Sequence, residues 1–381
     1  MPELRQDPCT RDWVVLAPQR GERPLEWGEP VPVPGSRETC PFCPGREERT
    51  PPELWRRPGP DGGWSIRVVP NRYPVVSPAP EPLTEPGTEP LTERGTEPGT
   101  EPLTERGTDP GTELLTEPAA EPVAKALTGP ATVPNAGPRR VRGLFRRAVA
   151  DGSHEVVIET PDHDWDIADG GPDTVAAVLD ACRARTRVLR ERGPGLVLPF
   201  RNHGAAAGTS LAHPHSQIVS TPVVPLRHRH LYDVARAYHD DTGGCLYLDL
   251  VGAELDDGAR VVAARERAAA FAPYAARTPY ETWVVPTERR ASFADASDEA
   301  LADVAALLVR VLGGLRRLLG DVPYNYAIVG APNGGEGARW FQWHVQIVPR
   351  LTIAAGFELG SGMAVNIVPP ERAAAELRNT P

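Results

Sequence analysis

Residues 202–219 read Asn202-His203-Gly204-Ala205-Ala206-Ala207-Gly208-Thr209-Ser210-Leu211-Ala212-His213-Pro214-His215-Ser216-Gln217-Ile218-Val219. The small residues in the first half of this stretch allow backbone amides to come close to an anion such as a phosphate. Pro214 excludes a helix and favours extended backbone. In an extended strand, His213, His215 and Gln217 alternate onto one face. The stretch therefore predicts a strand with two imidazoles and an amide on one side, preceded by a glycine-rich anion loop.

Two chemical roles are open to a His-x-His pair in a strand. A neutral imidazole can attack a phosphorus atom when its other nitrogen donates a proton to a fixed acceptor, and the product is a reactive phosphoramidate. Such pairs are otherwise typical of metal sites or of structural histidines. The glycine-rich segment before the pair and Gln217 after it favour His215 as a nucleophile that carries a nucleotide.

The two halves of the chain show the same order of short strand-like segments. Each half also has one amphipathic segment with apolar residues at three- and four-residue steps before a glycine, which predicts helices at about 172–191 and 298–319. We therefore predict an α+β fold of two tandem units, each an antiparallel sheet backed by helices. The matching segments are 40–43 and 245–248, 66–74 and 270–274, 154–158 and 280–286, and 215–219 and 344–348.

An acidic repeat interrupts the first unit. Residues 81–121 contain eleven acidic residues at four-residue spacing and two arginines, a local charge of −9 against −10 for the whole chain. Proline beside most of the acids and repulsion between like charges exclude a helix. We predict a disordered or polyproline II surface insertion at about 78–137, with an acidic tether for a partner as the alternative. The remaining chain divides into a catalytic half at 1–225 and a second half at 226–381.

Composition narrows the class of protein. The chain has 381 residues, of which 40% are hydrophobic, and it lacks both an apolar run of eighteen residues and an N-terminal hydrophobic signal core. We expect a soluble, cytoplasmic protein without a membrane or nucleic acid as partner. Five cysteines, with only Cys40 and Cys43 closely spaced, argue against a disulfide scaffold.

Cys40-Pro41-Phe42-Cys43 has the spacing of a zinc knuckle, in which both thiolates reach one tetrahedral ion. One cysteine pair supplies half of the ligands, so histidines must complete the site. His163 and His213 are the first choice, and His154 is the alternative to His163. A reduced cysteine pair near a turn remains the non-metal interpretation.

Arginines could add phosphate contacts. Arg20 and Arg23 stand in the motif Arg-x-x-Arg-Pro, shortly after a strand-like segment at 13–16. Guanidinium groups bind phosphate in bidentate fashion, although arginines in loops are often simply solvated.

Taken in order, these motifs resemble the galactose-1-phosphate uridylyltransferase family of the histidine-triad superfamily. The resemblance covers nearly the whole chain except the acidic insertion, and the His-Pro-His block is its most specific part. It rests on Arg-x-x-Arg-Pro, Cys-x-x-Cys, Pro-Asn-Arg-Tyr-Pro, Pro-Asp-His, Asn-x-Gly-Ala-x-x-Gly-x-Ser, His-Pro-His-x-Gln and a C-terminal Gly-Phe-Glu.

The resemblance implies a ping-pong exchange. UDP-glucose gives its UMP group to His215, and a hexose 1-phosphate, galactose 1-phosphate in the family, then takes it. Ser210 and Gln217 would assist at the phosphates, and a homodimer is expected in which a neighbouring subunit helps to complete the sugar site. The matching nucleotide- and phosphate-binding positions are Arg20, Arg23, Asn71, Asn202, Gly208 and Thr209; the sugar-binding positions are Phe357 and Glu358; the structural zinc ligands are Cys40, Cys43, His163 and His213, which places His163 ahead of His154.

The chain also departs from the family pattern. Where some members bind a second metal with a glutamate and three histidines, it has Leu231, Val329, His344 and Gln346, so we expect no iron-type site. A lysine of the sugar site is replaced at about Thr352, which leaves the acceptor open. The base is open as well, and an ADP-sugar phosphorylase or adenylyltransferase with the same His215 chemistry is the first alternative. A nucleotide-sugar hydrolase and a non-catalytic, zinc-stabilised nucleotide-binding module are the others.

Overall fold

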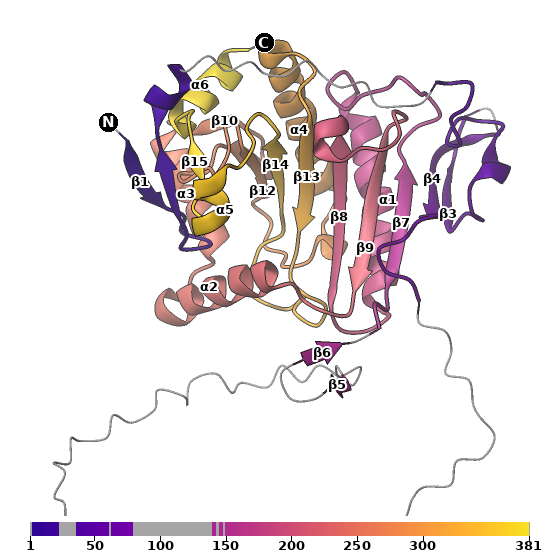
Figure 1. Cartoon of the computed structure of the whole chain (residues 1–381), viewed down its shortest axis with the longest axis horizontal. Coiled ribbons are helices and arrows are strands. Elements are labelled where there is room, and N and C mark those ends of the chain that lie inside the picture. Colours follow the sequence, from indigo (N-terminus) through magenta and orange to yellow (C-terminus); the bar gives the residue numbers. More distant parts are fainter. Residues whose placement is uncertain are drawn as a thin grey trace, which may run out of the picture. The chain divides into compact units, whose positions relative to one another are not determined.

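The computed structural model describes residues 2–22, 36–60, 62–78, 139–141, 145–147 and 149–380. Arg23 and, apart from Pro78, the predicted acidic insertion lie outside these ranges. The described residues form an α+β fold, as predicted, built around one large antiparallel sheet (Figure 1).

Ten strands form this sheet in the order β10-β11-β12-β14-β13-β8-β9-β7-β4-β3. From the outer edge to the centre of the sheet, the five strands of each half follow their order along the chain, except that the fifth strand lies before the fourth. The two halves meet where β8 pairs with β13. Strands of the first half are β3 (Trp55–Pro58), β4 (Trp64–Pro70), β7 (Ser153–Ile158), β8 (Leu196–His203) and β9 (His215–Thr221); those of the second are β10 (Val261–Ala264), β11 (Ala268–Phe271), β12 (Thr282–Pro286), β13 (Tyr324–Val329) and β14 (His344–Pro349). Because the sheet is continuous, the proposed boundary at residues 225 and 226 stays a prediction.

Two long helices pack side by side on one face of the sheet. They are α1 (Pro172–Arg190) and α4 (Asp298–Leu319), close to the predicted ranges. Proline at the first position starts α1, and Ser297 caps α4 by accepting a hydrogen bond from the amide of Ala300 at 3.2 Å. Their apolar faces and the sheet enclose the main hydrophobic core.

A second apolar cluster covers the opposite face of the sheet, but only over its C-terminal half. It is formed by helices α2 (Leu226–Thr242) and α3 (Leu246–Asp257) packing on β11, β12 and β13. We expected residues 245–248 to match the cysteine segment of the first half, and this was wrong. Cys245 is the N-cap of α3, because Leu246, Tyr247 and Val251 place apolar side chains at helical spacing.

Smaller elements complete the fold. A three-stranded sheet joins β1 (Glu3–Gln6), β2 (Trp13–Leu16) and β15 (Val365–Asn366), so the two ends of the described chain lie together. No helix among the described ranges is both long and apolar enough to span a membrane. The other elements are β5 (Arg139–Val141), β6 (Phe145–Arg147), α5 (Gly356–Ser361), α6 (Pro370–Asn379) and the 3-10 turns η1 (Pro18–Glu22), η2 (Glu47–Arg49), η3 (Ala205–Ala207) and η4 (Phe293–Asp295).

Candidate active site

Two cysteines and two histidines meet in a buried cluster. The ligand atoms of Cys40, Cys43, His163 and His213 all lie within 4.8 Å of one another. The Cys43 sulfur is 3.3 Å from Nδ1 of His163 and 3.6 Å from Nδ1 of His213, and the two Nδ1 atoms are 3.3 Å apart. The structure thus brings together the four residues assigned to the metal, including His163.

This cluster fits a zinc ion. Tetrahedral zinc with ordinary Zn–S and Zn–N bonds separates neighbouring ligand atoms by about 3.4–3.6 Å, close to the distances above. Nε2 of His213 lies 2.8 Å from the carbonyl oxygen of Thr160, to which it donates its proton. The lone pair of Nδ1 is therefore directed to the cluster, and burial lowers the pKa of His213 to about 4, which keeps the ring neutral.

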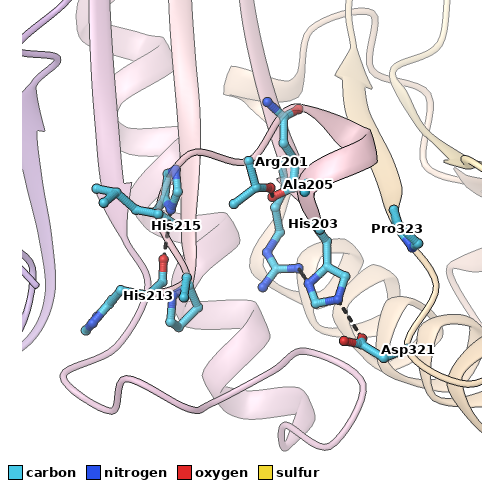
Figure 2. A pocket seen from close by; sticks show the side chains of 13 residues that line it. Arg201, His203, Ala205, His213, His215, Asp321 and Pro323 are labelled. Carbon is cyan, nitrogen blue, oxygen red and sulfur yellow. Dashed lines mark hydrogen bonds and ion pairs between the residues drawn. The ribbon is translucent and has the colours of Figure 1, made fainter. Parts of the chain in front are cut away.

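His215 is the first residue of β9 and lines a cavity of about 260 Å³ (Figure 2). Its Nδ1 lies 2.8 Å from the carbonyl oxygen of His213 and donates its proton there. Nε2 is therefore the nitrogen with the free lone pair. The side chain is 7% exposed, and burial lowers the pKa of His215. The arrangement supplies a neutral, oriented imidazole of the kind that nucleophilic catalysis requires.

The expectation that His213, His215 and Gln217 share one strand face was partly wrong. β9 begins at His215, so His213 lies in the bend before the strand, and its ring turns to the cysteines. Phe42 of the cysteine segment packs edge-on against both rings, with centroids 6.0 Å from His213 and 5.5 Å from His215. The cysteine–histidine cluster and His215 are therefore connected through the ring of Phe42 and the carbonyl group of His213.

The glycine-rich segment forms the loop above the cavity. Gly204 and Gly208 have φ values of 80° and 90°, a conformation that other residues rarely adopt. Thr209 closes the loop, since its hydroxyl donates to the carbonyl oxygen of Asn202 at 2.6 Å. Asn202, Gly204 and Thr209 line the cavity, whereas Ser210 is exposed and stands outside its lining.

Gln217 belongs to a polar group on the open face of the sheet. The amide of Val75 donates to Nδ1 of His154 at 3.2 Å, so the proton of this ring sits on Nε2. Nε2 then donates to Oε1 of Gln217 at 2.8 Å, and the side-chain nitrogen of Asn71 lies 3.1 Å from the same Nε2. His154 thus lies with Asn71, which we expected to bind the nucleotide, and with Gln217, which we expected at the phosphates, and not with the cysteines.

A buried ionic network holds the opposite face of β8 and β9. Glu159 accepts hydrogen bonds from Nε of Arg201 at 3.1 Å and from the hydroxyl of Ser216 at 2.6 Å. Arg201 also contacts the hydroxyl of Tyr324 on β13. These buried charges are paired, which fixes the ends of the two strands that carry the loop and His215.

Besides Ser210, six described residues expected near the substrate do not line this cavity. Asn71, Gly208 and Gln217 are three of them, and Arg20, Phe357 and Glu358 are the others. Arg20 is exposed on η1, and on α5 Phe357 is exposed and Glu358 is half-buried. Phe357 is 55% exposed, and Oε2 of Glu358 accepts from the amide of Ala355 at 3.2 Å, which caps its own helix. In Figure 1, α5 lies beside β15, over the C-terminal half of the sheet and away from β9.

The second half contains a counterpart of His215 that is closed off. Nδ1 of His344 donates to the carbonyl oxygen of Gln342 at 3.0 Å, as His215 does to that of His213. However, His344 is fully buried and stacks on Tyr247 and Trp283 with centroids 4.7 and 5.1 Å away. The side-chain NH₂ of Gln346 lies 3.0 Å from Nε2 of His344 and donates a hydrogen bond to the lone pair of this nitrogen. His344 therefore has no open cavity beside it.

The four positions compared with a second metal site have different surroundings. Leu231 and Val329 belong to the apolar cluster under α2 and α3, and His344 and Gln346 bond to each other. Within the described ranges, the Cys40–His213 cluster is the one group of three or more closely placed metal-ligating side chains.

Sequence reasoning missed several residues of the cavity. His203 lies 2.8 Å from a carboxylate oxygen of Asp321, and Pro323 packs against the loop at Gly204 (Figure 2). Asp321 and Pro323 belong to the C-terminal half, to which we had assigned only sugar contacts. No local motif marks them, because their place depends on the pairing of β8 with β13.

Comparison with known proteins identifies the relatives of this chain. Residues 130–225 match the family model for the N-terminal domain of galactose-1-phosphate uridyl transferase. An ADP-glucose phosphorylase from Arabidopsis thaliana is 30% identical over 99% of this chain and 92% of its own length. A galactose-1-phosphate uridylyltransferase from Thermotoga maritima is 24% identical over 100% of this chain and 99% of its own length. A crystal structure of an Arabidopsis thaliana ADP-glucose phosphorylase with bound ADP-glucose superposes with a TM-score of 0.75, at 28% identity and full coverage of both chains.

Proposed function

Since the chain belongs to the galactose-1-phosphate uridylyltransferase family, a family of nucleotidyltransferases, we propose that it moves a nucleoside monophosphate from a nucleotide sugar through a covalent intermediate on His215. One observation carries the proposal. Nδ1 of His215 is bound to the His213 carbonyl, so the Nε2 lone pair stays free beside a cavity roofed by a glycine-rich loop.

The proposed reaction has two steps. Nε2 attacks the α-phosphorus, the bond from this phosphorus to the oxygen of the sugar phosphate breaks, and sugar 1-phosphate leaves with the electron pair. An oxygen of the acceptor phosphate then attacks the same phosphorus, and the P–N bond breaks to restore neutral His215. The Asn202 side chain and loop amides that are free of bonds within the loop would hold phosphate oxygens, whereas the Thr209 hydroxyl keeps the loop closed. Gln217 and Asn71, which meet at His154, would hold the nucleotide.

Zinc would hold residues of the site in position and would not take part in the transfer reaction. Cys40, Cys43, His163 and His213 would hold the ion, and its binding would stabilise the bend that precedes β9. The His213 carbonyl that orients His215 belongs to this bend. A metal held by four protein ligands has no open position for substrate.

For the donor and acceptor, we propose an ADP-sugar, with ADP-glucose as the first choice, and inorganic phosphate. The support is the 30% identity to an ADP-glucose phosphorylase along nearly the whole chain. The family resemblance adds that a lysine expected in a uridylyltransferase sugar site is replaced at about Thr352. Uridylyl transfer from UDP-glucose to galactose 1-phosphate is the second candidate, favoured by the full-length match to the Thermotoga maritima enzyme.

A substrate panel separates these candidates. UDP-glucose and ADP-glucose, each labelled in the α-phosphate, would be incubated with the enzyme and either phosphate or galactose 1-phosphate. We expect labelled ADP from ADP-glucose and phosphate. Labelled UDP-galactose as the main product would favour the second candidate, and absence of any labelled product in all four reactions would contradict both.

We also propose that the enzyme works as a homodimer. Phe357 and Glu358 resemble sugar-binding residues but lie outside the lining of their own cavity, and exposed apolar side chains surround them. Ile353 and Leu359 of the same segment are 95% and 76% exposed. A second copy of the chain that brings this segment to the cavity would complete the site.

A further inference from the structure

Asn325 is an asparagine of the C-terminal half that reaches the glycine-rich loop of the N-terminal half. It lies on β13 opposite Asn202 on β8, at the pairing that joins the two halves of the sheet. Its side-chain nitrogen is 2.8 Å from the carbonyl oxygen of Ala207 and 2.9 Å from Oδ1 of Asn202. One amide group therefore contacts both the loop and a side chain that lines the cavity.

The Ala207 carbonyl fixes the orientation of both amides. A carbonyl oxygen only accepts, so the group of Asn325 that faces it must be the NH₂. The second hydrogen of this NH₂ points to Asn202 and requires an acceptor there. Asn202 must then turn Oδ1 to Asn325 and its own NH₂ to the other side, toward Gly208, where an added Cβ would lie 3.8 Å from Nδ2.

This orientation matters for an anion. The NH₂ of Asn202 can donate to a phosphate oxygen, whereas its Oδ1 in the same place would repel one. Flipping the Asn202 amide would leave two NH₂ groups facing each other between β8 and β13. The contact with Asn325 thus holds Asn202 in the donor orientation before any substrate binds.

Asn325 also restrains the loop itself. The Ala207 carbonyl belongs to η3, the turn between Gly204 and Gly208. Pro323, two residues before Asn325, packs on Gly204 so closely that a Cβ there would lie 2.9 Å from its own Cβ. The start of β13 therefore holds the loop at both ends of the turn.

We propose that Asn325 is a positioning residue for nucleotidyl transfer, which acts by holding the Asn202 amide and the glycine-rich loop in the geometry that binds the substrate phosphates. This inference rests on the proposed function of His215. It assigns the C-terminal half of the chain a role in the active centre of its own N-terminal half.

Asn333 provides a matched control. Its side-chain nitrogen donates to the carbonyl oxygen of Gly193 at 2.8 Å, so it too links the two halves through an amide, but it stands outside the lining of the cavity. Asn333→Ala should change the stability of the fold in a similar way without touching the phosphate site.

The test is a double-mutant cycle on the rate at which the labelled nucleotidyl group appears on His215 in a single turnover. We expect Asn325→Ala to slow this step by roughly 10- to 100-fold, as loss of an orienting partner does elsewhere, while Asn333→Ala leaves it unchanged. In the Asn202→Ala background, Asn325→Ala should slow this step by a smaller factor than in the wild-type background, because the shared contact is already gone and only the bond to the Ala207 carbonyl is still lost. Fully additive losses, or equal rates for Asn325→Ala and Asn333→Ala, would overturn the inference.

Asn325→Asp guards against a mere folding defect. It has the same shape, but its carboxylate only accepts, so it should turn the Asn202 NH₂ from the Gly208 side of the loop toward residue 325 and slow transfer at least as much as Asn325→Ala. A wild-type rate in folded, zinc-containing Asn325→Asp would refute the positioning role alone. Absence of an adduct in the wild-type enzyme would overturn the proposed function, and this inference with it.

Discussion

His213 and His215 are two residues apart, yet their rings carry the proton on opposite nitrogens. His213 donates from Nε2 to the Thr160 carbonyl, which leaves Nδ1 for the metal cluster. His215 donates from Nδ1 to the His213 carbonyl, which leaves Nε2 for the cavity. Each backbone acceptor thus selects one tautomer. Replacing His213 and replacing His215 should therefore remove different properties of the protein.

Zinc content separates the two roles. We expect His215→Ala to keep about one zinc per chain and to lose nucleotidyl transfer, because it removes the nucleophile and no ligand. His213→Ala should lose both the zinc and, since the bend before β9 is released, most of the transfer activity. Metal analysis after dialysis gives the answer. Equal zinc content in His213→Ala and wild-type protein would show that the cluster is not the metal site.

At the scale of elements, the active centre depends on how β8, η3 and β9 are connected. The loop leaves β8 at His203, turns at two glycines with positive φ, and enters β9 at His215. On this face of the N-terminal half, the segment with Cys40 and Cys43 packs on Val156 and Ile158, whereas α2 and α3 cover the same face of the C-terminal half. The two halves therefore differ in two ways: the C-terminal half has helices on this face of the sheet, and it lacks the histidine that corresponds to His213.

Gly204→Ala tests the fit of the loop. Its φ of 80° is strained for alanine, and the added Cβ would lie 2.9 Å from that of Pro323. We expect a loss of about 2–6 kcal/mol in the free energy of unfolding, since backbone strain and overpacking each cost about 1–3 kcal/mol. Gly334→Ala is the control, because Gly334 has a φ of 87° and no atom near the added Cβ. If both variants lose the same free energy in urea titrations, the packing against Pro323 contributes nothing.

Sequence patterns predicted the elements with strong local signals. The two long helices follow from their apolar periodicity, and the Cys-x-x-Cys segment and the histidines follow from ligand chemistry. The bend at His213 and the helix after Cys245 were missed. Alternation assumes that a strand continues through both histidines, and the position where β9 begins is set by the metal cluster and Thr160, which are distant in sequence.

At the scale of the whole molecule, the two related histidines of the described sheet differ in access: His215 lines a cavity, and His344 is fully buried. His344 repeats the backbone contact of His215, but Tyr247 and Trp283 stack on its ring and the side-chain NH₂ of Gln346 contacts its Nε2. Which residues of the second half reach the active centre could not be predicted from the sequence. Asp321, Pro323 and Asn325 arrive there because β13 pairs with β8, and long-range strand pairing leaves no local pattern.

The proposed dimer can be tested by complementation. Glu358→Gln keeps an oxygen to cap α5 but removes the charge, so it should impair sugar binding without unfolding the helix. When His215→Ala and Glu358→Gln chains are co-expressed, mixed dimers would contain one intact site, and activity should recover to about a quarter of the wild-type value. In the control, the Glu358→Gln chain is co-expressed with a chain that carries both substitutions, so that no mixed dimer contains an intact site. No recovery above that control would mean that each chain completes its own site.

The central claim is that His215 carries the nucleotide, and trapping the intermediate tests it most directly. The enzyme would be mixed with ADP-glucose or UDP-glucose labelled in the α-phosphate, without an acceptor, and then denatured in alkali, in which a phosphoramidate survives. We predict up to one labelled nucleotidyl group per chain, located on His215, lost in mild acid and absent from His215→Ala. Label that persists in His215→Ala, or no bound label in the wild-type enzyme while it still turns over the donor, would contradict the account.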